Sequence, residues 1–245
     1  MSQMLDYIKR LHDTSEELAK RIRFNKRVPR QLYLIELYLS LIELTSCIVT
    51  LVDKKRFAGV PALYRSLLEV FVDFINLSCD ECYVNHMQAK YHYEWLRVLN
   101  QSKNDTNPFL SQYSNWKDQD SIISEHKSEL DRLKKNGYSH LSIRQRFEKA
   151  GKVNEYLSLY NFLSSEAHSD IRALMHRHVK INQRCDDYLV VGYKNKPVSD
   201  FAAYLDSTAE ILLESTIRIH SFFDNDKPEE LKPFEVELNQ LKENS

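Results

Sequence analysis

Two sets of polar side chains stand inside otherwise apolar helical patterns, where an unpaired polar group would be costly. The first set is Arg65 and Glu69, and Asp73 continues it. Because these residues are four apart, they share one face of a helix. They form either an ordinary ion pair within that helix or one wall of a polar pocket. The apolar residues around them favour the pocket.

The second set is a row of polar residues at intervals of four, on what the sequence predicts to be one long helix over 152–180. The row consists of Tyr156, Tyr160, Ser164, His168, Arg172 and His176. Each step of four residues turns the helix by about 400°, so only about three neighbours can face one site. A histidine with a hydroxyl and a guanidinium one turn away on either side can be both oriented and kept partly neutral. A structural histidine bonded to Glu69 or to a tyrosine explains the same pattern.

The chemistry that these residue types suggest is RNA cleavage without a metal. That reaction needs a base for the 2′-hydroxyl, an acid for the leaving oxygen and a cation for the charge on the phosphorane. His168 could be one of the first two, with His178 or His176 as the other, and Arg65 and Arg172 could supply the cation. Because one helix cannot direct all these groups at one phosphate, we expect a symmetric homodimer.

The segments LYRSLLE (63–69) and YNFLSSEAHSD (160–170) contain the patterns Arg-x-x-x-Glu and Tyr-x-x-x-Ser-x-x-x-His. In these patterns the chain resembles a bacterial helical family of unknown function, over about residues 30–180. It is also similar, more distantly, to HEPN-type helical bundles, whose active ribonucleases carry Arg-x(4–6)-His near the start of a helix. The segment RALMHRH, from Arg172 to His178, fits that pattern. The resemblance implies an RNA-directed homodimer, either a ribonuclease or a toxin-type effector in bacterial defence.

These considerations predict one site in the polar pocket. The predicted catalytic residues are Arg65, Glu69, Ser164, His168, Arg172 and His178. The predicted substrate-binding residues are Tyr160, His176 and Arg177. The alternative is a non-catalytic helical bundle that binds a partner protein or a small ligand. In that case the polar cluster holds helices together.

Two clusters of basic residues could contact RNA, although solvated charged faces explain them as well. The first cluster contains Arg21, Arg23, Lys26, Arg27 and Arg30, and the second Arg172, Arg177, Lys180 and Arg184. Tyr160, Tyr188 and Tyr193 could stack on bases. The net charge of the whole chain is −1, which excludes binding to nucleic acid by bulk positive charge alone.

The sequence predicts no metal and no cofactor. Cys79, Cys82 and His86 have the spacing of metal ligands, but no second cysteine pair follows. The histidines His12, His92, His126 and His140 have no partner at a useful spacing. The four cysteines of the chain are expected to be free thiols. The N-terminal residues show no secretory signal and no segment reads as a membrane span, so we expect a cytoplasmic protein.

Glycine is scarce, with 4 residues where average usage would give about 17. No glycine-rich phosphate loop can be written, and a β-sandwich or a doubly wound α/β domain is disfavoured. The sequence therefore predicts an all-α bundle of about seven or eight helices. Helices are expected over 2–24, 30–55, 61–77, 82–103, 122–135, 142–149, 152–180 and 199–223, with a short extended segment at 187–193.

The apolar positions predict which faces are buried and where the domain ends. In the helix over 30–55 one stripe is expected to face the core: Leu34, Ile35, Tyr38, Leu41, Ile42, Thr45, Ile48, Val49 and Val52. In the helix over 152–180 the inward residues are expected to be Tyr156, Leu159, Tyr160, Leu163, Ala167, Ile171 and Leu174. Residues 1–223 are expected to form one domain with a polar loop at 104–120 and a last helix capped by Ser199. Residues 224–245 are expected to be a peripheral acidic tail.

Overall fold

A computed structural model describes residues 2–103, 107–114, 116–167, 170–182, 187–192, 197–223 and 228–243. These residues are mostly helical, which confirms the all-α prediction, although the helices are more numerous than the seven or eight expected. Contacts within the chain define two compact units. The first unit contains Met1–Ser78 and Phe147–Ser245, and the second contains Cys79–Arg146.

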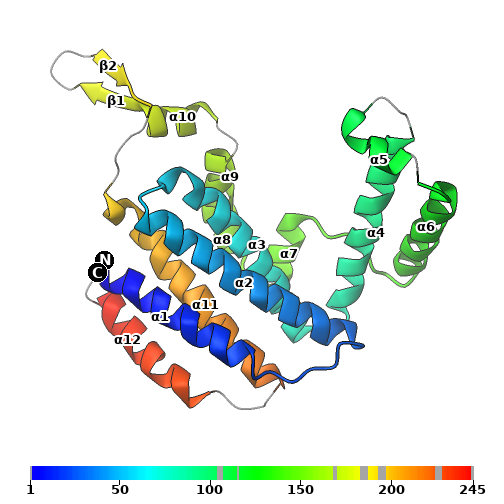
Figure 1. The fold of residues 1–245 in the computed structure, drawn as a ribbon, viewed down its shortest axis with the longest axis horizontal. Helices are drawn as coiled ribbons and strands as arrows, with labels where there is room; N and C mark the ends of the chain where they lie inside the picture. Colours follow the sequence, from blue (N-terminus) through cyan, green and yellow to red (C-terminus); the bar gives the residue numbers. More distant parts are fainter. Residues whose placement is uncertain are drawn as a thin grey trace. The chain divides into compact units, whose positions relative to one another are not determined.

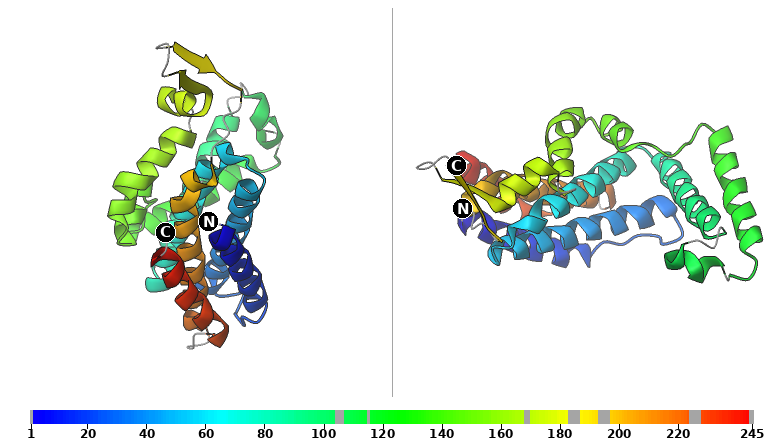
Figure 2. Two further views of the ribbon diagram at one scale, coloured as in Figure 1. Left: turned by 90° about the vertical axis from the view of Figure 1, so that its left-hand side faces the viewer. Right: turned by 90° about the horizontal axis from the view of Figure 1, so that it is seen from above.

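The first unit is built on three long helices that run side by side (Figures 1 and 2). They are α1 (Ser2–Ala19), α2 (Pro29–Asp53) and α11 (Ala202–Phe223). The helix α3 (Val60–Cys79) follows α2 after a short 3₁₀ turn, η1 (Phe57–Gly59). Its Phe74 ring lies 6.4 Å from the ring of Tyr38 on α2. These helices, with α3 among them, position the candidate functional residues of the first unit.

The buried residues of α2 are those that the apolar stripe predicts, from Leu34 to Val52, which confirms that part of the sequence analysis. By length and composition alone, α2 is also apolar enough to cross a membrane. Core helices often have the same length and apolar composition as membrane-spanning ones. In this structure α2 packs against both α1 and α11.

A buried polar contact joins the three central helices. The Tyr38 hydroxyl is 3.1 Å from the Thr216 hydroxyl on α11 and 3.3 Å from the Ser15 carbonyl on α1. The Ser15 and Thr216 hydroxyls lie 2.9 Å apart. Burial raises the pKa of Tyr38 to about 12, so the hydroxyl keeps its proton as a donor at neutral pH.

The segment expected to be a peripheral tail contains a helix that packs on the bundle. This helix, α12 (Lys232–Glu243), contacts α1 and α11. Its Phe234 and Leu238 are buried, and the Tyr7 hydroxyl donates to the Phe234 carbonyl at 3.1 Å. The helix α12 is amphipathic, so its apolar face packs on the bundle while acidic residues such as Glu235 remain outside that face.

The prediction of one continuous helix over 152–180 is wrong. The chain forms α8 (Val153–Glu155), a π-helical turn η3 (Tyr156–Tyr160), α9 (Asn161–Ala167) and α10 (Ile171–His178). Asp170 has an extended backbone, and its carboxylate accepts the Ala173 amide hydrogen at 2.9 Å, which caps a new helix. The row of polar residues is therefore interrupted.

The helix break also changes which side chains face inward. Ile171 and Leu174, predicted to be inward, are 77% and 44% exposed, whereas Ala173 is buried. After α10 the chain forms an antiparallel hairpin of β1 (Val179–Asn182) and β2 (Asp187–Val190). The predicted extended segment thus begins at the expected residue.

A 3₁₀ turn, η4 (Val198–Phe201), leads into α11, and its capping position is Pro197 rather than Ser199. The hairpin thus lies between two helices, with α10 before it and α11 after it.

The second unit is built on α4 (Tyr83–Ser102) and α6 (Gln119–Lys135), which pack against each other. Ala89, Leu130 and Leu133 form its small buried core. The predicted polar loop at 104–120 contains a 3₁₀ turn, η2 (Pro108–Leu110), and a short helix, α5 (Ser111–Ser114). The boundary between the two units falls within α7 (Ile143–Lys149), after Arg146.

Two histidines without a partner at a useful spacing in the sequence pair across α4 and α6. The Nδ1 atoms of His92 and His126 lie 2.8 Å apart, so at least one of them carries no proton at that atom. The indole of Trp95 stacks on His126 with ring centres 6.0 Å apart. Burial, followed by the proximity of His126, lowers the pKa of His92 below the ordinary value of 6.5.

This pair predicts that the second unit loses stability in mild acid. The unfolded chain protonates His92 at about pH 6.5, whereas the folded unit resists protonation until lower pH, so stability falls as the pH drops through this window. The two tryptophans of the chain, Trp95 and Trp116, both lie in this unit. We expect the fluorescence-detected unfolding temperature to fall between about pH 7 and pH 5.

The variant His92→Phe is expected to flatten that dependence. Burial lowers the pKa of His140 as well, so the informative quantity is the difference in slope between the variant and the wild type. Equal slopes would contradict the role assigned to His92.

Candidate functional site

The predicted pair Arg65 and Glu69 lies on α3 and closes around one tyrosine of η3. An Arg65 guanidinium nitrogen donates to the Tyr160 hydroxyl at 2.7 Å, and that hydroxyl donates to Glu69 Oε1 at 2.7 Å. Arg65 Nε lies 3.4 Å from the same carboxylate oxygen. These contacts fix η3 against α3.

Tyr160 is enclosed by its neighbours. The Arg65 guanidinium carbon lies 4.9 Å from the centre of its ring, and Tyr156 stacks on it at 5.5 Å. Tyr160 is 4% exposed. Burial, then the hydrogen bond to Glu69, raises its pKa, and Arg65 opposes that rise. Its ring has no open face for a base, so the structure gives the predicted substrate-binding role no support. The cluster has the geometry of a structural lock.

A separate cavity of about 510 Å³ lies in the first unit where regular elements end. It is lined by residues of η1, α9, α10, η4 and the start of α11. The aromatic lining residues are Phe57, Phe162, Phe201 and Tyr204, and the charged or titratable ones include Glu166, His176, Arg177 and His178. Such a combination of apolar walls and a few polar groups is typical of ligand pockets.

Glu166 is the buried anion of this pocket. Its side chain is 6% exposed, and Oε1 lies 3.7 Å from His176 Nδ1. Its other carboxylate oxygen lies 4.0 Å from Arg177 Nε, and Arg177 also donates to the Glu166 backbone carbonyl. Burial, then the charge of Glu166, raises the pKa of Tyr204. Glu166 thus links α9 to His176 and Arg177 in the last turn of α10.

His178 is oriented by the base of the hairpin. Its Nδ1 lies 3.1 Å from the Val191 carbonyl, which can only accept, so Nδ1 carries the proton. The Val191 amide donates in turn to the His178 carbonyl at 2.8 Å. With Nδ1 as the donor, a neutral His178 has its lone pair on Nε2, the atom available for proton transfer.

Arg172 lies on the first turn of α10 and is exposed. Its guanidinium carbon lies 5.1 Å from the centre of the Phe162 ring, and Phe162 lines the pocket. A cation held over an aromatic ring at a pocket rim can contact an anionic ligand without being desolvated first.

The sequence of the chain matches one family of proteins, described as a family of unknown function (DUF5677), over residues 31–186. The chain belongs to this family. The prediction of a family of unknown function is thereby confirmed. No curated protein and no solved structure matches the chain.

The region shared with the DUF5677 family contains both polar clusters. The predicted site is divided between them: Arg65, Glu69 and Tyr160 form the lock, whereas His176, Arg177 and His178 line the pocket. His168 and the side chain of Ser164 lie outside the described part of the chain.

The sequence analysis missed Glu166. Glu166 follows the buried Tyr160 and Leu163 at steps of three, so it lies on the inward face of this segment. A carboxylate at such an inward position is the sequence signal that could have identified it.

The first basic cluster is partly used by the fold. Arg30 donates to the carbonyls of Leu77 and Ser78 at the end of α3, and Arg21 pairs with Glu230 at 2.7 Å. Of the predicted stacking tyrosines, Tyr188 is 67% exposed, while Tyr193 lies outside the described residues, as does Arg184. In the second cluster, Arg177 lines the pocket and Arg172 lies over the ring of Phe162, which lines it too.

The lock predicts a measurable loss of stability on removal of one oxygen atom. Tyr160→Phe removes the hydroxyl between Arg65 and Glu69 while keeping the ring, and we expect unfolding to cost roughly 1.5–3 kcal/mol less. Denaturant unfolding followed by circular dichroism measures the change. The matched control is Tyr156→Phe, because the Tyr156 hydroxyl makes no hydrogen bond within the described part of the chain. Equal stabilities of the two variants would argue against the lock.

Proposed function

We propose that this chain is an RNA-directed protein that cleaves phosphodiester bonds without a metal, at the pocket between α9 and α10. One observation carries the proposal: His176 and His178 line a cavity with aromatic walls, beside the buried Glu166. Arg172 stands over a ring of the same cavity. These are the acid–base and cationic groups that such a reaction needs.

In the proposed reaction, His178 Nε2 takes the proton of a ribose 2′-hydroxyl. The 2′-oxygen attacks the phosphorus atom, and the bond from phosphorus to the 5′-oxygen breaks. His176 gives a proton to that leaving oxygen, and Arg172 neutralises the charge of the phosphorane. The products are a 2′,3′-cyclic phosphate and a 5′-hydroxyl. Glu166 and Arg177 are positioning residues, because their contacts are with each other and with His176.

RNA is the substrate class that fits the surroundings of the pocket. Phe162 is 41% exposed, so a base can stack on it. The arginine of the RALMHRH segment lies in the first turn of α10, because the helix begins at Ile171. A position near a helix start is where the distant HEPN-type resemblance places this arginine, which supports a role in bacterial defence as ribonuclease or toxin-type effector. We propose a cytoplasmic location for that activity.

Incubation of the purified chain with single-stranded RNA in EDTA tests the proposal. We expect cleavage by the wild type that leaves 2′,3′-cyclic phosphate ends. His178→Ala and His176→Ala are each expected to reduce the rate by roughly 10²- to 10⁴-fold, the usual contribution of a general acid or base. His140→Ala, which changes a histidine of the second unit, is the matched control and is expected to retain the rate.

Cleavage that persists in both pocket variants comes from another site or from a contaminant and would end the proposal. Absence of cleavage by the wild type would favour the second candidate, a non-catalytic bundle that binds a partner protein or small ligand. The observation in favour of that candidate is the closed contact of Arg65, Tyr160 and Glu69, which needs no substrate to explain it.

We further propose that the chain acts as a homodimer that is held together by an exposed apolar surface. Apolar side chains of α10 and β2 are exposed: Ile171, Met175, Tyr188, Leu189 and Val190. Exposed apolar surface of this kind is typical of association sites. The double variant Ile171→Lys with Met175→Lys is expected to halve the mass measured by light scattering. A monomeric wild type would contradict this proposal without affecting the assignment of the pocket.

A further inference from the structure

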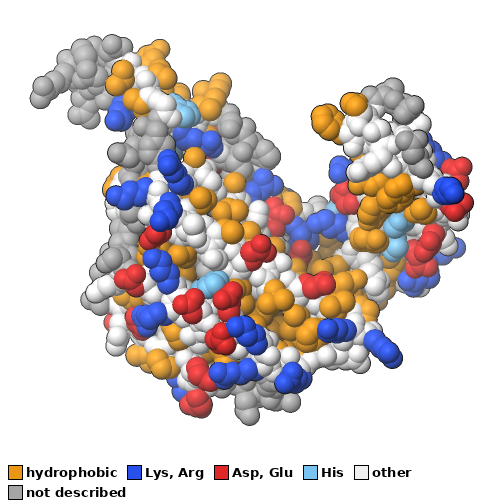
Figure 3. Space-filling view, in the orientation of Figure 1, with side chains coloured by type: hydrophobic (Ala, Val, Ile, Leu, Met, Phe, Trp, Pro, Cys, Tyr) orange, Lys and Arg blue, Asp and Glu red, His pale blue; other side chains and the backbone are white. Residues whose placement is uncertain are grey.

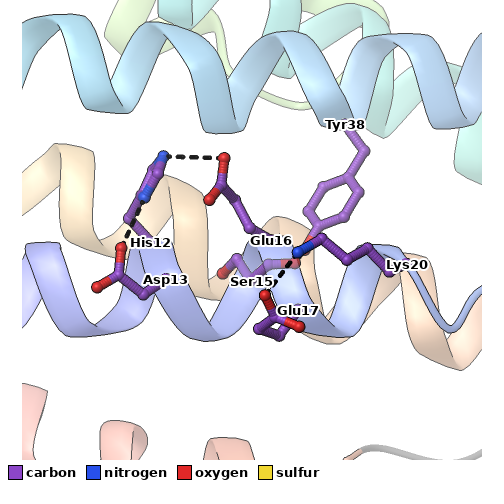
Figure 4. Close-up of polar contacts among 7 residues, drawn as sticks. All are labelled: His12, Asp13, Ser15, Glu16, Glu17, Lys20 and Tyr38. Carbon is purple, nitrogen blue, oxygen red and sulfur yellow. Dashed lines mark hydrogen bonds and ion pairs between the residues drawn. The ribbon is translucent and has the colours of Figure 1, made fainter.

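A second group of titratable side chains lies on α1, away from the α9–α10 pocket. His12 and Glu16 are one turn apart, and His12 Nε2 lies 3.9 Å from Glu16 Oε1 (Figure 4). His12 Nδ1 lies 3.3 Å from a carboxylate oxygen of Asp13. The ligating atoms of the three side chains all lie within 4.8 Å of one another. The sequence analysis overlooked the spacing of four between His12 and Glu16.

Asp13 fixes the orientation of the imidazole. A carboxylate oxygen accepts, so the proton on Nδ1 points to Asp13 and the lone pair of a neutral ring is on Nε2, on the side of Glu16. The His12 side chain is 16% exposed, and Asp13 is 81% exposed. A histidine that donates one ring nitrogen to a carboxylate is the usual arrangement of a metal ligand with its supporting group.

A second pair of candidate ligands faces the same cavity from α2. The cavity has a volume of about 730 Å³ and is lined by His12 and Glu16 of α1 and by Glu43 and Cys47 of α2. Glu43 and Cys47 are also four residues apart, so they share one face of α2. Cys47 is a free, exposed thiol.

The pairing of α1 with α2 brings these residues into the same stretch of the groove. The Lys9 ammonium lies 3.0 Å from Asp53 at one end, and the Tyr38 hydroxyl lies 3.3 Å from the Ser15 carbonyl at the other. His12 lies between these contacts on α1, and Glu43 and Cys47 lie between them on α2. Both pairs therefore line the same stretch of the groove, and within each pair the residues are one turn apart.

The groove carries charges of both signs, because Glu16 and Glu43 line it together with Lys20 and Lys26. On the face of the molecule that carries α1 and α2, acidic and basic side chains both lie around a histidine (Figure 3). Lys20, which also lines the cavity, is held by Glu17 with an Nζ–Oε1 distance of 2.6 Å. In Figure 4 the His12 and Glu16 side chains rise from α1 towards α2, whereas Asp13 and Glu17 point away from it.

From this arrangement we propose a site for Zn²⁺ or a similar divalent transition metal between α1 and α2. Its ligands are His12, Glu16, Glu43 and Cys47, and Asp13 supports His12. A thiolate, an imidazole and carboxylates form a donor set that suits zinc. Two ligands of a tetrahedral zinc ion stand roughly 3.4 Å apart, so small rotations suffice for His12 and Glu16, whose atoms are 3.9 Å apart. Glu43 and Cys47 complete the set by rotating into the groove from α2. The bound metal clips α1 to α2 and stabilises the first unit.

Titration of the full chain with Co²⁺ and, by calorimetry, with Zn²⁺ tests the site. We expect one ion per chain, with the absorption bands of tetrahedral cobalt and a thiolate-to-cobalt charge-transfer band. Cys47→Ser is expected to abolish the charge-transfer band, and Asp13→Asn to weaken Zn²⁺ binding by roughly 10- to 100-fold. His12→Ala is expected to weaken it at least as much. Zn²⁺ is expected to raise the unfolding temperature of the wild type and not that of His12→Ala.

The matched controls are Cys82→Ser and His140→Ala, both in the second unit, and neither is expected to change binding. Circular dichroism without metal verifies that each variant is folded. Binding unaffected by Cys47→Ser and His12→Ala, binding lost in Cys82→Ser, or no binding by the wild type would each overturn the proposal. Because the cleavage assay contains EDTA, its outcome is independent of this site.

Discussion

The carboxylate of Asp170, which accepts the Ala173 amide hydrogen, is the contact on which the candidate site depends. Asp170 caps α10 as a new helix, separate from α9, which ends at Ala167. Without that cap, a continuous helix would place Arg172 and His176 on one winding row with Tyr160. With it, α10 has its own direction, and its last turn meets the buried Glu166. One hydrogen bond at a helix start, ordinarily a matter of local stability, here determines which titratable groups share a cavity.

The two polar clusters of the first unit differ in what encloses them. The hydroxyl of Tyr160 has a guanidinium on one side and a carboxylate on the other, so its hydrogen-bonding capacity is used within the protein. In the pocket, Glu166 is buried in a similar way, but His176 beside it is 53% exposed. A buried anion that supports an exposed titratable group provides orientation without closing the site. This difference in exposure, rather than residue type, separates a lock from a candidate site.

Periodicity along the sequence predicts those buried helix faces that are decided by residues close together in the chain. The stripe from Leu34 to Val52 on α2 is correct because nine positions, all apolar except Thr45, agree on one face. The face of α10 is wrong because Asp170, a polar residue in a helical pattern, caps a helix instead of continuing one. The pair His92 and His126 was invisible because it forms across two helices 34 residues apart. The pair His12 and Glu16 was visible in the spacing, and its significance depended on the facing residues of α2.

Scarce glycine suggested that any site must be assembled from side chains on helix faces. The structure refines that idea, because the pocket forms where helices end: at η1, at the end of α10 beside the hairpin, and at η4. At such points backbone groups such as the Val191 carbonyl are free to orient a side chain, which carbonyls inside a helix are not. Along the helix faces, polar residues either close on one another, as Arg65 and Glu69 do around Tyr160, or line a groove between antiparallel helices. The groove between α1 and α2 is the second case, and there the side chains of two helices together must supply every ligand, since each helix satisfies its own backbone.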